Sequence, residues 1–369
     1  MSVPVRLAIL GATGSIGRQA LDVVRAHPDR LRVVGLGANR NADGLGELAM
    51  EFPTARTALG ASALAALATD PDADLVLVAT PGVAALRATV AALEDGKRVA
   101  LANKEVLVAA GHLIQHLAGG AGERLRPVDS EHNGLWQCLA GERLADVRRI
   151  ALTASGGAFR DVPAEALPGV TPEHALHHPT WKMGPKVTID SATLVNKAYE
   201  VVEAHWLYDI PYDRIDVVLH KESLVHALVE YADGSVKAQI AEPDMRLPIQ
   251  YALLWDRAPS PAPRFDWTAE RTLHFGPIDL SRYPCFSVVL ETAHSGDLGA
   301  MIGISAADEI AVERFLRGDI PFTDISALLR RGAEVGAAAH AGPEPDLEEV
   351  IAIDASVRSV LGHTQPVIA

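Results

Sequence analysis

Residues 5–17, VRLAILGATGSIG, decide the fold. The first six residues form a short apolar run that predicts a buried strand, and three glycines follow it at intervals of three. From Ile16 onward, apolar residues recur at helical spacing until His27 and Pro28 end the pattern. A strand, a glycine turn and a helix in this order predict a site where backbone N–H groups bind the pyrophosphate of a dinucleotide. An ordinary tight turn is the alternative interpretation of the glycines alone.

The same alternation continues outward from this segment. Apolar runs at residues 31–36, at 75–79, at 99–102 and near Val128 predict further strands, and helical spacing separates them. Parallel strands need crossover connections, which helices usually provide. The sequence therefore predicts an α/β protein whose residues 1–128 form an N-terminal Rossmann-type, doubly wound sheet that binds NADPH.

Beyond residue 128 the pattern changes. Residues 149–153 predict a strand, residues 191–206 predict a helix, and residues 228–240 predict a hairpin that turns at Asp233-Gly234. Five prolines between residues 155 and 186 predict a long loop, which we interpret as a mobile lid. We expect a central α+β catalytic domain over residues 129–256, a linker over 257–285, and a small C-terminal helical bundle over 286–369.

Composition excludes several classes of protein. The 369 residues carry 33 basic and 47 acidic side chains, and a net charge of −14 argues against a nucleic-acid binder. Apolar runs fall short of the roughly 18 residues that a membrane span needs. Cys138 and Cys285 form neither a disulfide framework nor a metal cluster, and the N-terminus lacks a leader pattern. We therefore expect a cytoplasmic protein that binds neither nucleic acid nor membrane.

The end of the second strand indicates which dinucleotide binds. Proteins that bind NAD carry an acidic residue about 20 residues after the glycines. Here the strand leads into Asn39-Arg40-Asn41, and a guanidinium between two amides suits a 2′-phosphate. We therefore expect NADPH, with an ordinary exposed loop arginine as the alternative interpretation of Arg40.

Two carboxylates follow the last strand of the predicted sheet. In extended backbone, Asp129 and Glu131 share a face and can direct their oxygens at one point, which then needs a cation. Carboxylates with no cysteine nearby favour Mg²⁺ or Mn²⁺ over Zn²⁺. A solvated acidic turn is the alternative interpretation on so acidic a protein.

A predicted helix supplies a third carboxylate. Asn196 and Lys197 precede Glu200 by four and three residues, so the three share a face within about one turn, or about 5.4 Å. An anion held by Asn196 and Lys197 would then lie one turn from a metal held by Glu200, a span that suits a short sugar phosphate. A surface ion pair between Lys197 and Glu200 is the alternative interpretation. Ser155 and the two glycines after it offer further phosphate contacts.

These motifs resemble the 1-deoxy-D-xylulose-5-phosphate reductoisomerase family. In chain order, the motifs that carry the resemblance are GATGSIG at 11–17, LANKE at 101–105, PVDSEHN at 127–133, SGG at 155–157, HPTWKMG at 178–184, the segment 190–200, and EPDMR at 242–246. The resemblance implies an enzyme that rearranges 1-deoxy-D-xylulose 5-phosphate and reduces the product with NADPH to 2-C-methyl-D-erythritol 4-phosphate, for isoprenoid synthesis. It also implies Mg²⁺, Mn²⁺ or Co²⁺ as the metal, and a homodimer.

The resemblance assigns roles to individual residues. The implied metal ligands are Asp129, Glu131 and Glu200, which with Lys104 are the catalytic residues. The implied substrate contacts, which include two of those carboxylates, are Ser130, Glu131, Ser155, His178, Trp181, Ser191, Asn196, Lys197 and Glu200. The implied cofactor contacts are Thr13, Gly14, Ser15, Ile16, Asn39, Arg40, Asn41, Asn103, Glu105 and Gly184. The sequence departs from the usual pattern of the family at Thr80-Pro81-Gly82, Lys221-Glu222 and Asp308.

Two rival functions fit parts of the same pattern. Another NADPH-dependent oxidoreductase, acting on a small phosphorylated or semialdehyde substrate, would need no divalent ion. A non-catalytic NADPH-binding protein would have no use for the three carboxylates and Lys197.

Overall fold

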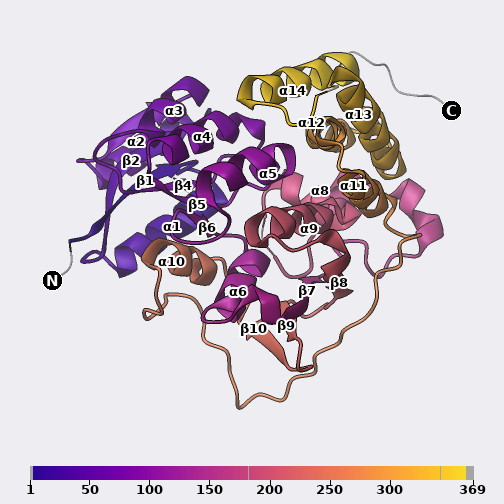
Figure 1. The fold of residues 1–369 in the computed structure, drawn as a ribbon, viewed down its shortest axis with the longest axis horizontal. Coiled ribbons are helices and arrows are strands. Elements are labelled where there is room, and N and C mark those ends of the chain that lie inside the picture. Colours follow the sequence, from indigo (N-terminus) through magenta and orange to yellow (C-terminus); the bar gives the residue numbers. More distant parts are fainter. Residues whose placement is uncertain (1–2, 182, 341, 363–369) are drawn as a thin grey trace.

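The structure, a computed structural model, describes residues 3–181, 183–340 and 342–362. It contains two β-sheets and a group of C-terminal helices (Figure 1). Lys182, in the expected lid, and residues 363–369, in the expected C-terminal domain, lie outside the described residues.

The first sheet has six parallel strands in the order β3-β2-β1-β4-β5-β6, which confirms the expected doubly wound fold. Its strands are β1 (Val5–Leu10), β2 (Leu31–Ala38), β3 (Arg56–Leu59), β4 (Leu75–Val78), β5 (Arg98–Leu101) and β6 (Leu125–Pro127). The helices between them are α1 (Ser15–Ala26), α2 (Ala42–Glu51), α3 (Ala61–Ala68), α4 (Leu86–Glu94) and α5 (Glu105–Ala118). The strand order reverses between β1 and β4, where sheets of this kind bind ligands.

Both faces of this sheet are buried. Leu7 and Ile9 of β1 pack with α1, α2 and α10 (Arg246–Leu254), whereas Ala8 and Leu10 pack with α3, α4 and α5. A strand buried on both faces is apolar throughout, which explains why residues 5–10 indicate the fold so clearly. Helix α10 packs on this first sheet, although its residues lie in the range expected for the central domain.

The second sheet has four strands in the order β10-β9-β7-β8. Its strands are β7 (Val147–Ala154), β8 (Ile215–Leu219), β9 (Val225–Tyr231) and β10 (Val236–Ile240). Strands β7 and β8 are parallel, and the β9–β10 hairpin turns at Asp233-Gly234 as predicted, with φ of +84° at the glycine. Helix α6 (Ser130–Leu139) leads from the first sheet and packs on β9.

The helix predicted over residues 191–206 is two helices. Helix α8 (Pro185–Thr193) ends and α9 (Val195–Tyr208) begins at Leu194, whose φ of +58° lies in the left-handed region. A leucine seldom adopts this conformation, which usually falls to glycine at the end of a helix. Because residue 194 is not a glycine, the break is not apparent from the sequence.

The proline-rich segment, predicted as a loop, contains short helices. These are a 3₁₀ helix at Ala164–Gly169 and one turn of α7 at Pro172–Ala175, where Thr171 caps the turn and Pro172 begins it. Proline suits a first helical position because that residue needs no N–H donor. The expected lid is therefore partly helical.

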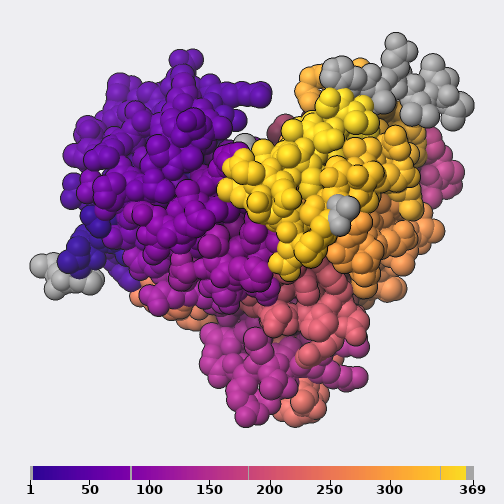
Figure 2. Space-filling view, turned by 45° about the horizontal axis from the view of Figure 1, so that its top comes forward, coloured from indigo at the N-terminus to yellow at the C-terminus, as the bar shows by residue number. Residues whose placement is uncertain are grey.

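The C-terminal region is helical, as predicted. It comprises α11 (Pro284–Ser295), α12 (Leu298–Arg317), α13 (Ile325–Ala339) and α14 (Leu347–Gly362). Short 3₁₀ helices elsewhere are Val83–Ala85, Leu144–Asp146, Tyr212–Arg214 and Phe322–Asp324. The C-terminal helices, orange to yellow in Figure 2, lie against the first sheet's helices, and an ion pair between Arg87 and Glu348 joins the two parts. Within the described ranges, no helix combines the length and the apolar character that a bilayer span requires.

Candidate active site

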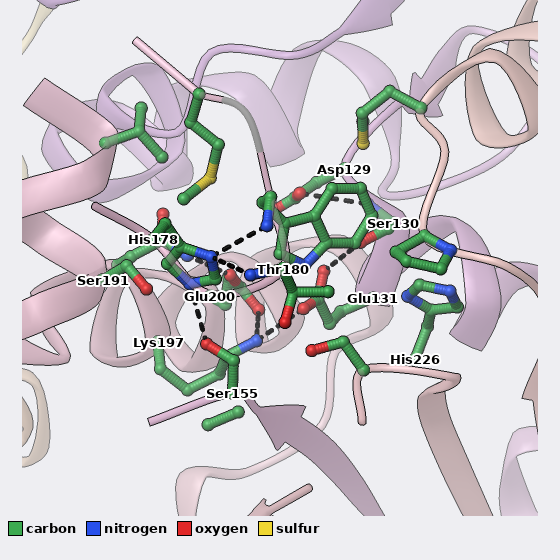
Figure 3. Close-up of a pocket in the computed structure, with 18 of the residues that line it drawn as sticks. Asp129, Ser130, Glu131, Ser155, His178, Thr180, Ser191, Lys197, Glu200 and His226 are labelled. Carbon is green, nitrogen blue, oxygen red and sulfur yellow. Dashed lines mark hydrogen bonds and ion pairs between the residues drawn. The ribbon is translucent and has the colours of Figure 1, made fainter. Parts of the chain in front are cut away.

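A cavity of about 580 Å³ lies where the two sheets meet. Its wall is formed by the beginning of α1, the ends of β5 and β7, the beginning of α6, the segment before α8, and α9. Figure 3 shows the side chains that converge there, from residues as far apart in the chain as Asp129 and His226. Residues expected to bind substrate and residues expected to bind cofactor thus face one space.

Three carboxylates converge in this cavity. Oxygens of Asp129, Glu131 and Glu200 lie within 4.8 Å of one another. The backbone route differs from the prediction: Asp129 is not extended strand but the N-cap of α6, and Glu131 lies in the first turn of that helix. Aspartate favours this position because its carboxylate accepts the Ser130 N–H, at 3.0 Å. The turn, rather than the alternation of a strand, brings the two side chains together.

Two lysines neutralise these carboxylates. Lys197 Nζ lies 2.7 Å from Glu131 Oε1 and 2.5 Å from Glu200 Oε2, while Lys104 contacts Asp129 and lies 3.5 Å from Glu200 Oε1. Burial is the largest single influence and raises the pKa of Glu131, but the nearby charges, chiefly that of Lys197, together with the Lys197 hydrogen bond outweigh burial, and the pKa falls to about 2. Each of the three carboxylates is thus paired with a lysine, and the alternative of a solvated acidic turn is wrong.

The helical face predicted from spacing is present, with one difference. Asn196 Nδ2 donates to Glu200 Oε1 at 2.6 Å, so Asn196, Lys197 and Glu200 do share a face. However, the Asn196 amide and the Lys197 ammonium contact the Glu200 carboxylate itself, whereas the prediction had them hold an anion one turn away from it.

The protonation state of His178 follows from its hydrogen bonds. Its Nδ1 accepts the backbone N–H groups of Thr180 at 3.1 Å and Trp181 at 2.8 Å, so Nε2 carries the proton and donates to Ser155 Oγ at 3.0 Å. Burial is the main cause that lowers the pKa of His178 to about 4. Gly157 N–H also donates to Ser155 Oγ, at 3.2 Å. The Ser155 hydroxyl hydrogen remains free for a ligand in the cavity.

Two glycine positions require the absence of a side chain. Gly157 has φ of +72°, and a Cβ there would lie 2.3 Å from the carbonyl oxygen of Ser191. Gly17 in α1 would place a Cβ 2.3 Å from the carbonyl oxygen of Gly11. At Gly157 the segment after β7 packs closely against α8, and at Gly17 the first turn of α1 packs closely against the glycine turn. Both bring backbone close to the cavity wall.

The beginning of α1 reaches the cavity through Ser15 and Ile16. Its N-cap is Gly14, which has no side chain, so the first N–H groups of the helix are open to a ligand. Other expected cofactor residues do not line the cavity: Thr13, Gly14, Asn39, Arg40, Asn41, Asn103 and Glu105.

Three of these residues have other partners. Asn41 is the N-cap of α2, and its Oδ1 accepts the Gly44 N–H at 2.9 Å. The Asn103 side chain donates to the carbonyl oxygens of Thr80 and Gly82 and accepts from Val106, which fixes the loop at one of the departures noted above. Glu105 is buried and pairs with Lys186 at 3.0 Å. By contrast, Arg40 is exposed at the end of β2.

Several cavity residues were not among the expected contacts. His226 and Ser223 also line the cavity, with His226 beside Glu131 (Figure 3), and the rings of Trp181 and His226 are 6.0 Å apart. A histidine inside an apolar strand is the signal that could have identified His226, but the predicted hairpin began at residue 228 and so missed it. Behind Asp129, His132 and Glu203 form a second buried group with it, and Lys104 Nζ lies 3.7 Å from Glu203.

Family models match most of the chain. A model described as 1-deoxy-D-xylulose 5-phosphate reductoisomerase matches residues 7–59 and 53–111, and the C-terminal domain models of that enzyme match residues 125–208 and 240–360. The 1-deoxy-D-xylulose 5-phosphate reductoisomerase of Thermomicrobium roseum is 47% identical over 373 residues, covering 96% of both chains. That of Geobacillus kaustophilus is 44% identical over 376 residues, covering 96% of this chain and 97% of the relative.

Solved structures agree in fold over nearly the whole chain. A crystal structure of DOX-P reductoisomerase in complex with NADPH, fosmidomycin and magnesium superposes with a TM-score of 0.91 at 35% identity, covering 97% of each chain. The Zymomonas mobilis enzyme in complex with NADPH gives a TM-score of 0.87 at 38% identity, covering 98% of this chain and all of the other.

Proposed function

The chain belongs to the 1-deoxy-D-xylulose 5-phosphate reductoisomerase family, and from this premise we propose that the cavity between its two sheets is the active site. The protein is an NADPH- and divalent-metal-dependent enzyme that converts 1-deoxy-D-xylulose 5-phosphate to 2-C-methyl-D-erythritol 4-phosphate. We propose below which residues bind the metal, the substrate and the cofactor.

One observation carries the proposal: the three convergent carboxylates of Asp129, Glu131 and Glu200. Carboxylate oxygens are the ligands that Mg²⁺ and Mn²⁺ prefer. Three acidic charges against the two of Lys104 and Lys197 leave an excess of negative charge that a dication would offset. The residues present therefore fit a divalent ion, and we assign Asp129, Glu131 and Glu200 as its ligands.

When bound, the metal supplies a Lewis acid for the charge that develops on substrate oxygens, and NADPH supplies the hydride. The protein's task is then to bind and orient the substrate in the cavity. Lys104 and Lys197, which neutralise the carboxylates in the structure, become available to substrate oxygens once their partners bind a metal. We assign Lys104 to the reacting hydroxyl groups because it lies at the carboxyl end of β5, beside the carboxylates.

The phosphate end of the substrate is proposed to lie between β7 and the beginning of α9. Ser155 offers a free hydroxyl hydrogen, and Ser191, Asn196 and Lys197 line the same side of the cavity. The neutral His178 ring donates to the Ser155 hydroxyl and accepts the backbone N–H of Trp181. These hydrogen bonds link the segment before α8 to the part of the cavity proposed to bind the substrate's phosphate. Trp181 then covers the cavity and excludes water.

The cofactor is proposed to extend from the first turn of α1 to the end of β2. Ser15 and Ile16 reach the cavity, and the open N–H groups of α1 suit a pyrophosphate. Arg40, at the end of the neighbouring strand, would bind the 2′-phosphate. Gly184 lines the cavity where the nicotinamide would lie.

An assay of NADPH oxidation with 1-deoxy-D-xylulose 5-phosphate tests the function. We expect turnover with Mn²⁺, loss of turnover after EDTA treatment, and recovery when Mn²⁺ is restored. Full turnover after EDTA treatment would instead indicate an oxidoreductase without a metal. Binding of NADPH with no turnover under any condition would indicate a non-catalytic binding protein.

A homodimer and a cytoplasmic location are further parts of the proposal. Strand β10 is an unpaired edge, and Val236 on it and Trp267 in the following linker are exposed by 55% and 81%. Such apolar surface beside a free strand edge favours pairing with a second copy. Light scattering should give twice 39.1 kDa for the wild type and a monomer for Val236→Lys. A wild-type monomer would contradict the dimer.

Cys138 and Cys285 are buried and unpaired, as expected in a reducing compartment.

A further inference from the structure

A buried charge cluster outside the cavity joins three helices, α5, α8 and α12. Lys186 Nζ lies 2.7 Å from Asp190 in α8, 2.7 Å from Asp308 in α12, and 3.0 Å from Glu105 in α5. The three carboxylate side chains are at most 9% exposed. We call these four residues the Lys186 cluster. Helix α12 belongs to the C-terminal helices, so the cluster connects that part of the chain to the two sheets.

The cluster has more acid than base. One ammonium faces three carboxylates, and Asp190 Oδ1 and Asp308 Oδ1 are buried with no hydrogen-bond partner among residues 3–181, 183–340 and 342–362. Burying several like charges with a single counter-ion is costly, and two neighbouring buried carboxylates commonly hold one proton between them. The spare oxygens of Asp190 and Asp308 are where that proton would be held.

Among the residues that the structure describes, no cation other than Lys186 pairs with Asp190 or Asp308. From the elements packed there, the titratable and charged groups are Lys186 (α8), Glu105 (α5), exposed Glu173 and His174 (α7), Tyr199 (α9), Cys285 (α11), Glu309 (α12), Arg330 (α13), and Asp354 and Arg358 (α14). Arg358 is paired with Asp354 at 2.7 Å and with Glu309 at 3.0 Å. Burial raises the pKa of both Tyr199 and Cys285, so each stays neutral near neutral pH.

The directions of the pKa shifts of Asp190, Asp308 and Glu105 agree on where the proton is held. Burial, reinforced by Asp308, raises the pKa of Asp190 well above its usual value, and burial also raises the pKa of Asp308. Burial is the largest single influence on Glu105 and would raise its pKa too, but the charge of Lys186, the hydrogen bonds to the carboxylate and the charge of Lys104 together outweigh burial, and the pKa falls. Glu105 is therefore the ionised partner of Lys186.

We propose that Asp190 and Asp308 share one proton at neutral pH, and that this proton locks α8 to α12. Three of the four members adjoin a cavity residue: Asp190 precedes Ser191, Glu105 follows Lys104, and Lys186 precedes Val187. Asp308 is thus a positioning residue that acts through α8 on the phosphate end of the cavity. This last step rests on the function proposed above, whereas the shared proton does not.

The proton makes stability depend on pH in a defined direction. The folded pair holds a proton that an unfolded aspartate releases near pH 4. Its contribution to stability is therefore complete below about pH 4 and is lost as pH rises through the raised pKa of the pair. For one proton, the unfolding equilibrium constant rises up to about tenfold per pH unit in that range.

Asp308→Asn tests the proposal because the amide keeps the shape and removes the need for the proton. Thermal unfolding would be followed from pH 6 to pH 9.5. We expect the wild type to lose stability with rising pH more steeply than Asp308→Asn, and Asp190→Asn to behave like Asp308→Asn. The matched control is Asp354→Asn, which removes a buried acid that has its own arginine, so it should lower stability without changing the slope.

Kinetics supply the second readout. The KM for 1-deoxy-D-xylulose 5-phosphate should rise on the alkaline side in the wild type and stay flatter in Asp308→Asn, with kcat affected less. Parallel unfolding profiles of wild type, Asp308→Asn and Asp190→Asn would overturn the shared proton. Different profiles with parallel KM values would overturn the positioning role alone. Absence of wild-type turnover would refute the proposed function and leave the unfolding result to decide on the proton.

Discussion

His178 shows how a single side chain determines its own protonation state. Two backbone donors on Nδ1 and the Ser155 hydroxyl at Nε2 require the neutral ring, and the pKa of about 4 agrees with this. The unfolded chain takes up the proton near pH 6.5. The stability that the neutral ring contributes is thus present above about pH 6.5 and is lost as pH falls through about pH 4.

The expected outcome is a difference in acid sensitivity. Between pH 7 and pH 4.5, the melting temperature of the wild type should fall more steeply than that of His178→Gln, which cannot be protonated. His174→Gln is the control, because His174 is exposed and adjoins the same segment. If His178→Gln followed the wild-type curve in parallel, the assigned protonation state would be wrong.

Arg40 is the residue that should separate NADPH from NADH. A charge-assisted contact contributes about 1.5 to 3 kcal/mol, so Arg40→Ala should weaken NADPH binding by roughly 10- to 100-fold. NADH has no 2′-phosphate, and its affinity should stay within about twofold. Fluorescence titration would measure both constants. Arg32→Ala, on the same strand and also exposed, is the control, and an unchanged preference in Arg40→Ala would refute the role.

At the scale of elements, the contact between the end of β7 and α8 depends on Gly157. An alanine there would combine a left-handed φ with a Cβ 2.3 Å from the Ser191 carbonyl oxygen. Strain of this kind costs about 1 to 3 kcal/mol or forces the two elements apart. Gly157→Ala should therefore lower the melting temperature and raise the KM for the sugar phosphate.

Gly169→Ala is the matched control. Gly169 lies in the same proline-rich segment, and a Cβ there meets nothing within 4 Å. Thermal unfolding and steady-state kinetics of both variants decide the matter. Equal and small effects of the two substitutions would show that the close approach at Gly157 is not needed.

Helices and strands were predictable from the sequence where they depend on local patterns, that is, on residues close together in the chain. Five of the six strands of the first sheet and the β9–β10 hairpin follow from apolar runs and a turn, which are local patterns. The edge strand β3 (Arg56–Leu59) was missed, because most of its residues are exposed and it has no apolar run. The break at Leu194 was missed because tertiary packing, and not a glycine, maintains its left-handed backbone. Asp129 was expected in a strand, because a helix N-cap and a strand end look alike without the structure.

At the scale of the whole molecule, the sequence indicates which residues matter better than it indicates what they contact. Asp129, Glu131 and Glu200 were singled out by residue type and family resemblance, and the structure brings them together. The Lys186 cluster could not be foreseen, because its four members come from α5, α8 and α12. Lys186 and Asp190 are four residues apart in α8, but only the fold determines that Glu105 and Asp308 meet them.

The central claim is that the three convergent carboxylates bind one divalent ion, and Mn²⁺ binding measured by calorimetry tests it most directly. The wild type should bind one Mn²⁺ per chain. Glu200→Gln should bind it at least about tenfold more weakly, since it loses a charged ligand. Glu142→Gln, an exposed acid paired with Lys237, should bind like the wild type. Equal Mn²⁺ affinity in the wild type and Glu200→Gln would contradict the account.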